Sequence, residues 1–459
     1  MKSRVTSFIL RSTALFSGAE VLSVVCGVVR TKVIAIVAGA AGIGLLGILM
    51  SVYDLAGSVA MSGLRMGGVR SIASASITHR NEIINLIRRI ALWLGVGAGA
   101  VTLILSPLLS YISLGSPTWW TMFAAVGLAV VFNSFTASEG AVMQGSGRMK
   151  ELASASGEGA VAALILSCCA VYFLRDDFGI VAVVFIYAVV TASCYVVNGH
   201  RSAKWTLTRN TFSATVKEGR ALLRMSGALT LSGLAALAAG YAVISSISFA
   251  AGVGESGLYQ AGYLIVVRYV GIIFTSMAVE YFPRLSAPSV GRWRASVMMR
   301  HECMIFLPLV TVGGVALSVL VVPMVRLLYD DSFLPVVPMI LLAVPSLVAR
   351  VMAWNMAFVV LAKGSSRLYL TTECIGAALM IVCVAGGYAL YGLPGAGAGI
   401  TLEYLLYAAM EAVVLKRKFS IAAGRRVWLV AAVCFIVTVI AASIVLYCLS
   451  PLQGYGSTV

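Results

Sequence analysis

The sequence predicts an all-α polytopic membrane protein made of two six-helix lobes, with one extra helix at the C-terminal end. Composition is the first reason: the 459 residues are 60% hydrophobic and 11% charged, with a mean hydropathy of +0.99. Soluble domains carry about 25% charged residues, and no polar stretch here is long enough to form one. The second reason is a series of bilayer-length apolar runs from end to end, and the third is an internal repeat.

Thirteen apolar segments are long enough to cross a bilayer as helices, since about 20 residues suffice. The first resembles a signal peptide, but it has no small-residue cleavage site and continues past the usual apolar core, so we expect it to be the first span. The expected spans are residues 6–37, 41–65, 85–112, 117–146, 149–174, 177–198, 219–250, 255–285, 296–328, 334–363, 366–391, 393–416 and 424–449.

Positive charge marks one side of the membrane. Of the 33 Lys and Arg residues, 26 fall at one set of span ends, whereas the opposite set holds Arg175 and Arg326 beside four aspartates. Cytoplasmic ends of spans carry the excess of Lys and Arg, so the N-terminus is predicted to be cytoplasmic. This pattern also explains the net charge of +16, and we expect membrane lipids rather than nucleic acid as its partner.

Four motifs recur in the same order, with an offset of 213 to 219 residues. They pair LRSTALFSG (10–18) with LRMSGALTLSG (223–233), AGAAGIGLLG (38–47) with AAGVGESGLYQ (250–260), QGSGR (144–148) with KGSSR (363–367), and YFLRDDFG (172–179) with YALYGLPG (388–395). The repeat predicts lobes at 1–210 and 211–418, and an extra helix with a short tail at 419–459.

Each predicted lobe holds six spans, so both start on the same side and are parallel repeats about an axis along the membrane normal. Two such lobes enclose a cleft near the midplane, which is typical of transporters that work by alternating access. A channel is more often a symmetric oligomer around a shared pore. A membrane enzyme usually shows a sizeable loop with catalytic or metal-binding residues, and the outer loops here are short.

The segment RTKVIAIVAGAAGIGLLGILMSVYDLAGSVAMSGLRMGGVRSIA (30–72) resembles the first two spans of Wzx-type polysaccharide flippases of the MOP exporter superfamily. GESGLYQAGYLIVVRYVG (254–271) resembles the entry to their second lobe. The resemblance implies export of an undecaprenyl-pyrophosphate-linked oligosaccharide, such as an O-antigen unit of lipopolysaccharide, across the bacterial inner membrane. It also implies glycan polymerases or glycosyltransferases as partners. A thirteenth span departs from the family's usual twelve or fourteen.

No cofactor or metal site is expected. The nine cysteines lie almost entirely in apolar segments and form no CxxC pair, which is typical of small buried side chains. The three histidines, His79, His200 and His301, are scattered at span ends without the spacing of metal ligands.

Cations within the spans are the first candidates for a binding site. A charge in mid-helix costs about 2.5–3.5 kcal/mol on insertion scales, so it should face the cleft or a partner. Arg binds pyrophosphate through its bidentate fork, and Lys acts as a point charge. Arg30 and Lys32 lie about 200° apart on a helix, so a straight helix points at most one inward; both could also snorkel outward. We expect a cationic cleft of Arg30, Lys32, Arg268 and Arg350, with Arg30 before Lys32.

Carboxylates within the spans are candidates for gating and for coupling to H⁺ or Na⁺. Asp54 and Arg268 are 214 residues apart, within the repeat offset, so they are predicted to be equivalent in the two lobes and to form a gating pair; alternatively, each pairs inside its own lobe. Glu158 and Glu373 match at an offset of 215, and each either takes up an ion or bonds nearby Ser and Thr. Further mid-span carboxylates are Glu139, Glu20, Glu403 and Glu411.

Three other functions stay open at this point. A drug or cation antiporter of the same superfamily favours an acidic cavity, whereas this chain mixes Arg and Lys into the membrane. A peptidoglycan-precursor flippase is close in mechanism. A membrane polymerase, ligase or glycosyltransferase acting on lipid-linked glycans should show a catalytic loop or a carboxylate motif beside a nucleotide site, and no DxD motif is present. We therefore expect a transporter rather than an enzyme.

Overall fold

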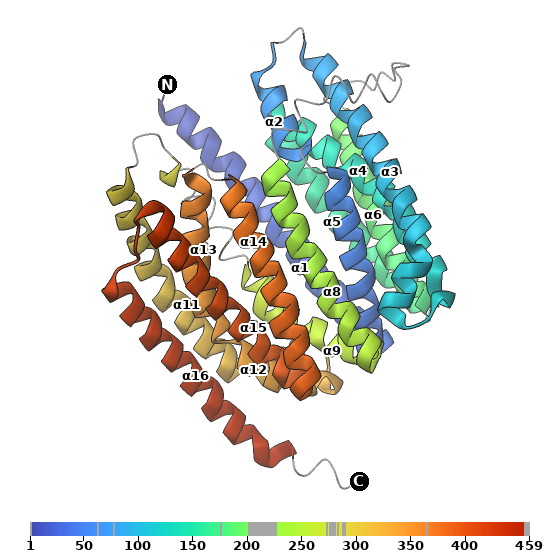
Figure 1. The fold of residues 1–459 in the computed structure, drawn as a ribbon. Coiled ribbons are helices and arrows are strands. Elements are labelled where there is room, and N and C mark those ends of the chain that lie inside the picture. Colours follow the sequence, from blue (N-terminus) through green and yellow to red (C-terminus); the bar gives the residue numbers. More distant parts are fainter. Residues whose placement is uncertain are drawn as a thin grey trace. The chain divides into compact units, whose positions relative to one another are not determined.

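The computed structural model describes residues 2–61, 64–76, 79–174, 177–200, 227–271, 274, 281, 284–286, 291–363 and 366–453. These residues are helical almost throughout, and no strand occurs among them (Figure 1). Their contacts form two compact units, Met1–Leu237 and Ala238–Val459. The predicted lobe boundary at residue 210 lies outside the described residues, so the predicted domain limits stay predictions.

The first unit is a bundle of long helices. They are α1 (Lys2–Met61), α2 (Leu64–Ser74), α3 (Arg80–Leu114), the short 3₁₀ turn η1 (Pro117–Trp119), α4 (Trp120–Gly145), α5 (Met149–Leu174) and α6 (Asp177–His200). Helix α3 packs on α4, α5 packs on α6, and α1 contacts α4 and α5. The α3–α4 contact is close because Gly99 and Gly127 face one another: a Cβ at Gly99 would lie 2.6 Å from the carbonyl O of Gly127. Such small-residue contacts are typical of packing between membrane helices.

Helix α1 contains the boundary between the first two predicted spans. Gly39 interrupts it with φ 63° and ψ −159°. Residues other than glycine rarely adopt this backbone conformation. Cys26 and Arg30 before this break line the same cavity as Tyr53 and Asp54 after it. The chain therefore turns back at Gly39, between the predicted spans 6–37 and 41–65.

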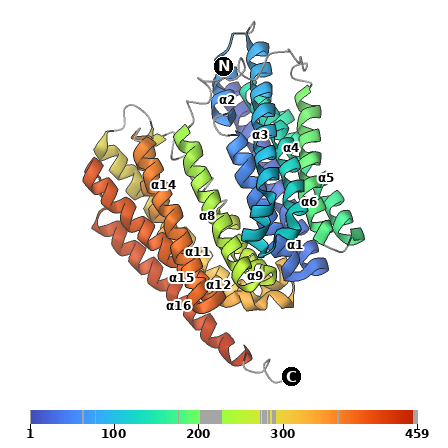
Figure 2. The same ribbon diagram turned by 45° about the vertical axis from the view of Figure 1, so that its right-hand side comes forward.

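The second unit is also helical. Its elements are α8 (Gly227–Ala251), which begins before the division of the units, α9 (Val253–Tyr263), the π-helical η2 (Leu264–Tyr269), α11 (Arg292–Leu328), the 3₁₀-helical η3 (Asp331–Val336), α12 (Val337–Ala343), α13 (Ser346–Ala362), α14 (Ser366–Met380), the π-helical η4 (Ile381–Ala385), α15 (Gly386–Val414), the π-helical η5 (Leu415–Phe419) and α16 (Arg425–Gln453). Helices α14 and α15 lie side by side, and α16, the predicted extra helix, packs on α11 (Figure 2).

Helix α15 begins with a hairpin. Tyr391 (φ −137°, ψ 18°) and Gly392 (φ 62°, ψ −146°) break it. The flanking segments then run antiparallel in close contact, since a Cβ at Gly395 would clash with the carbonyl O of Gly387, and one at Gly399 with that of Cys383. This reversal lies between the predicted spans 366–391 and 393–416.

Among the described residues, nine helices are long and apolar enough to cross a membrane, or ten if Asp331–Ala343 and Ser346–Ala362, bent by 52°, form one span. Two of the nine contain the reversals at Gly39 and Gly392 and so hold two predicted spans each. The predicted span 255–285 lies partly outside the described residues. The all-α polytopic class is thus confirmed, and the total of thirteen spans stays a prediction.

Candidate functional site

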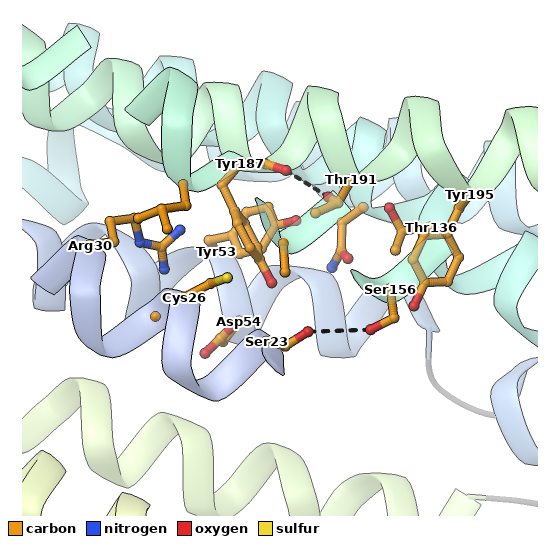
Figure 3. Close-up of a pocket in the computed structure, with 14 residues that line it drawn as sticks. Ser23, Cys26, Arg30, Tyr53, Asp54, Thr136, Ser156, Tyr187, Thr191 and Tyr195 are labelled. Atoms are coloured by element: carbon orange, nitrogen blue, oxygen red, sulfur yellow. Dashed lines mark hydrogen bonds between the residues drawn. The ribbon is translucent and has the colours of Figure 1, made fainter. Parts of the chain in front are cut away.

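A cavity of about 260 Å³ lies inside the first unit, among helices α1, α4, α5 and α6 (Figure 3). Most of its lining is polar or aromatic although the surrounding helices are apolar, and polar groups at membrane depth are retained mainly for function. The lining residues are Ser23, Cys26, Gly27, Arg30, Tyr53, Asp54, Asn133, Thr136, Ser156, Ala160, Leu164, Tyr187, Thr191 and Tyr195.

One end of the cavity carries its charges and two of its tyrosines. The guanidinium of Arg30 lies 4.9 Å from the centre of the Tyr187 ring, a cation–π contact that restrains the Arg side chain. Tyr53 meets Tyr187 edge to face, with ring centres 6.4 Å apart. Asp54 follows Tyr53 and is half-buried. One cation and one carboxylate thus line the cavity, and their formal charges cancel.

The remaining lining offers hydroxyl and amide groups. The hydroxyls of Ser23 and Ser156 lie 3.3 Å apart and join α1 to α5, as Figure 3 shows. Thr191 donates to the carbonyl O of Tyr187 at 2.6 Å. Gly57 makes room for Asn133, because a Cβ at position 57 would clash with the Asn133 amide. Hydroxyl, amide and phenol groups around one charge pair suit a polar ligand with many hydroxyls.

The structure brings Arg30 and Asp54 together at this cavity and places the other predicted residues of the first unit elsewhere. Lys32 is half-buried and Glu20 is exposed, and neither is among the residues that line the cavity. Glu158 is exposed and accepts a hydrogen bond from the Asn198 amide at 3.3 Å. The three tyrosines of the lining were not predicted, because tyrosine in an apolar helix has the same pattern as an ordinary core residue.

Glu139 forms a buried ion pair with Arg88, which joins α4 to α3. Its two oxygens accept from Nε and Nη2 of Arg88 at 2.7 and 2.8 Å, and the side chains are 0% and 2% exposed. Gly199 on α6 packs against this carboxylate, since a Cβ there would clash with Glu139 Oε2. In the sequence, Arg88 is one of the charges at the ends of the predicted spans, and its position does not indicate this pair. The feature of the sequence that indicates an ion pair is Glu139 itself, since a glutamate in the middle of a membrane helix needs a cationic partner.

In the second unit, the side chain of Arg350 is buried among the helices. It is 6% exposed and donates from Nη1 to the carbonyl O of Val267 at 2.9 Å. Its guanidinium lies 4.6, 5.0 and 5.6 Å from the ring centres of Phe274, Trp354 and Tyr404. Arg268, by contrast, is exposed on η2.

The carboxylates of the second unit that the sequence singled out lie on α14 and α15. Glu373 is half-buried and accepts from the Tyr407 hydroxyl at 2.7 Å. Glu411, one helical turn after Tyr407, is fully buried, and the side chains of Thr372 and Tyr407 lie near its carboxylate. Asp54 and Arg268 lie in different units, so their gating pair stays a prediction. The described residues contain no group of three or more His, Cys, Asp or Glu side chains that could hold a metal ion.

Comparison with known families decides what kind of protein carries this cavity. Residues 9–287, more than half of the chain, match the model of the polysaccharide biosynthesis protein family. The chain belongs to this family. Comparison with curated proteins gives no significant match.

Solved structures extend the family assignment to the fold. An inward-facing multidrug resistance MATE transporter of the MOP superfamily matches with a TM-score of 0.69 at 17% identity, over 87% of this chain and 94% of its own. The lipid II flippase MurJ, in an inward closed conformation, matches with a TM-score of 0.66 at 13% identity, over 94% of this chain and 98% of its own. The family match confirms the predicted relationship to polysaccharide biosynthesis proteins, and these two structures show that the chain shares their fold. Both solved structures are of transporters or flippases.

Proposed function

We propose that this protein moves an undecaprenyl-pyrophosphate-linked oligosaccharide from the cytoplasmic to the outer leaflet of a bacterial inner membrane by alternating access, with its N-terminus in the cytoplasm. The observation that carries this proposal is the polar, tyrosine-lined cavity inside the apolar helices of the first unit. Its hydroxyl and amide groups match the hydroxyls of a sugar, and its tyrosine faces suit the apolar face of a sugar ring. The family match to polysaccharide biosynthesis proteins supports the same substrate class.

The size of the cavity favours part of a glycan. Its volume of about 260 Å³ lies just below the roughly 300–1,000 Å³ of pockets that enclose drug-sized ligands. One or two sugar units fit such a space, and the rest of the glycan extends from it. The prenyl tail stays in the apolar interior of the bilayer, so the protein need not bind it in a polar cavity.

Arg30 is the proposed contact for the pyrophosphate. An Arg fork binds two phosphate oxygens at once, and the Tyr187 face below Arg30 restrains the guanidinium before substrate arrives. Asp54 balances this charge when the cavity is empty, and the entering pyrophosphate competes with it for Arg30. Lys32 and Arg268 serve as further cations along the path.

The proposed transport is coupled to an inward flow of H⁺ or Na⁺. Glu411 supports this, because a fully buried carboxylate is costly unless a cation or proton visits it. Glu373, which bonds Tyr407, lies within electrostatic range of Glu411. Glu158 is a second candidate. Glu139 is better suited to hold α3 and α4 together through Arg88 than to exchange ions.

A deletion strain tests the proposed function. Cells lacking this protein should accumulate the lipid-linked oligosaccharide on the cytoplasmic leaflet and lose the surface glycan, and the wild-type gene should restore both. The Arg30→Ala and Asp54→Asn variants, expressed at the wild-type level, should restore neither. A normal distribution of the lipid-linked glycan between leaflets in the deletion strain would refute the proposal.

A drug or cation antiporter is the second candidate, because a MATE transporter shares the fold. The charge balance of Arg30 and Asp54 in the cavity argues against a site for cationic drugs. An antiporter would change the sensitivity of the deletion strain to cationic drugs while leaving its surface glycan intact.

A flippase of peptidoglycan precursors would instead make the deletion lethal or cause lysis. A membrane enzyme acting on lipid-linked glycans would leave unprocessed glycan on the outer leaflet.

A further inference from the structure

Two irregular helical segments of the second unit meet at Arg350. The first is η2, where α9 continues into the π-helical turn Leu264–Tyr269. The second is the 52° bend between α12 and α13, and Arg350 lies in the second turn of α13. Sharp bends and π-helical turns are costly departures from regular helix, and π-helical turns occur often at functional sites.

The hydrogen bond of Arg350 falls at the C-terminal end of the π-helical turn. There the carbonyl O of Val267 accepts from the backbone N–H of Val270, three residues on, which is the spacing of a 3₁₀-helix and not of a π-helix. The same oxygen also accepts from Nη1 of Arg350 at 2.9 Å. A donor that carries charge makes this bond stronger than one between neutral groups. Arg350 therefore stabilises the irregular turn at its C-terminal end.

Three aromatic rings fix the guanidinium that makes this bond. Phe274, Trp354 and Tyr404 approach it within 4.6 to 5.6 Å, and cation–π contacts are stronger away from water than at an exposed site. Arg350 is 6% exposed, so substrate has little access to it. Glu403, itself 7% exposed, lies within electrostatic range of the Arg350 guanidinium.

We propose that Arg350 is a positioning residue, which holds the π-helical turn Leu264–Tyr269 and thereby sets the direction of the neighbouring side chain of Arg268. A π-helical turn contains one residue more than an α-helical turn. Its loss would rotate the side chains on one side of it by about 100° relative to the other. Arg268 lies in this turn, directly after Val267, and is exposed. The structural part of this inference stands alone, whereas its consequence for transport rests on the proposed role of Arg268.

Cysteine labelling tests the structural part in the full-length protein. Arg268→Cys is labelled with a water-soluble methanethiosulfonate in membranes, and the signal of the native cysteines, measured with Arg268 present, is subtracted. Adding Arg350→Met, which keeps the volume but removes donor and charge, should change the labelling rate at position 268 at least fivefold. Arg350→Lys should change it less, in the same direction.

The matched control removes another hydrogen bond between a side chain and the backbone of a neighbouring helix. Thr401 on α15 donates to the carbonyl O of Leu342 on α12 at 2.7 Å, and Thr401→Val should leave labelling at position 268 unchanged. An unchanged rate in both Arg350 variants would overturn the proposal. So would an equal change in Thr401→Val, because Arg350 would then act through general loosening of the unit.

A double-mutant cycle on glycan export tests the consequence for transport. Arg268→Ala and Arg350→Met should each lower export by about tenfold, and the double variant should be no worse than Arg268→Ala, because both act through one side chain. Independent effects would multiply to about 100-fold and contradict positioning through Arg268. If Arg268→Ala exports normally, the proposed role of Arg268 fails, and the labelling experiment still decides whether Arg350 sets its direction.

Discussion

Removing one charge of the buried Arg88–Glu139 pair should lower the stability of the protein far more than removing a comparable charge at its surface. The pair joins α3 to α4 by two charge-assisted hydrogen bonds of 2.7 and 2.8 Å, each worth about 1.5–3 kcal/mol. Glu139→Gln leaves the guanidinium buried without its counter-charge, and breaking such pairs costs about 3–5 kcal/mol. For a unit of this size, a loss of 1 kcal/mol lowers Tm by about 2–4 °C, so we expect a fall of about 6–20 °C.

Thermal unfolding of purified protein in detergent, followed by tryptophan fluorescence, measures this effect. Arg326–Asp331 is the matched control: its Nε–Oδ1 distance is 2.6 Å, but its side chains are 58% and 75% exposed. Exposed pairs contribute about 0–1 kcal/mol, so Arg326→Gln should lower Tm by less than about 4 °C. The double variant Arg88→Met/Glu139→Leu should recover much of the loss, because it leaves no buried charge. Equal shifts for Glu139→Gln and Arg326→Gln would refute the reasoning.

Three further predictions concern the cavity, the ion coupling and the packing around Glu139. Arg30→Lys keeps the charge but loses the bidentate fork, so glycan export in the complemented deletion strain should fall about tenfold; export at the wild-type rate would contradict the pyrophosphate contact. Glu411→Gln should fold normally yet make transport insensitive to an imposed proton or sodium gradient, and a wild-type response would exclude Glu411 from coupling. Gly199→Ala should cost about 1–3 kcal/mol by overpacking against Glu139, seen as a lower Tm, whereas Gly97→Ala, which meets open space, should not destabilise the protein.

The helical organisation could be predicted because its signal is local. Apolar length and positive-charge clusters place the ends of most spans, and the glycine-containing breaks in α1 and α15 fall within the predicted gaps between spans. Asp54 and Arg30 could also be singled out, because charges in apolar segments are rare and costly. These inferences need no knowledge of which helices become neighbours.

The contacts within the site could not be predicted, because they depend on how the helices pack. Arg88 and Glu139 are 51 residues apart. The sequence around Arg88 resembles the sequence around any other charged residue near the end of a span. Tyr187 faces Arg30 because α6 lies beside α1, and nothing in the sequence around Tyr187 distinguishes it from a core tyrosine. The position of Arg350 in the sequence shows its depth in the membrane but not the three rings around it, and its predicted place in a cationic cleft stays a prediction.

The predicted repeat relates positions whose surroundings differ between the two units, and this difference bears on mechanism. By the offset of 216 residues at the nearest motif pair, Tyr187 corresponds to Glu403. Tyr187 lines the open polar cavity of the first unit together with Asn133. Glu403 is nearly buried, at 7% exposure, and lies within electrostatic range of Arg350 of its own unit. A position whose polar group already has protein partners has little to gain from substrate. We therefore expect sugar recognition to depend on the first unit, and Asn133→Ala to weaken export more than Glu403→Gln at equal expression.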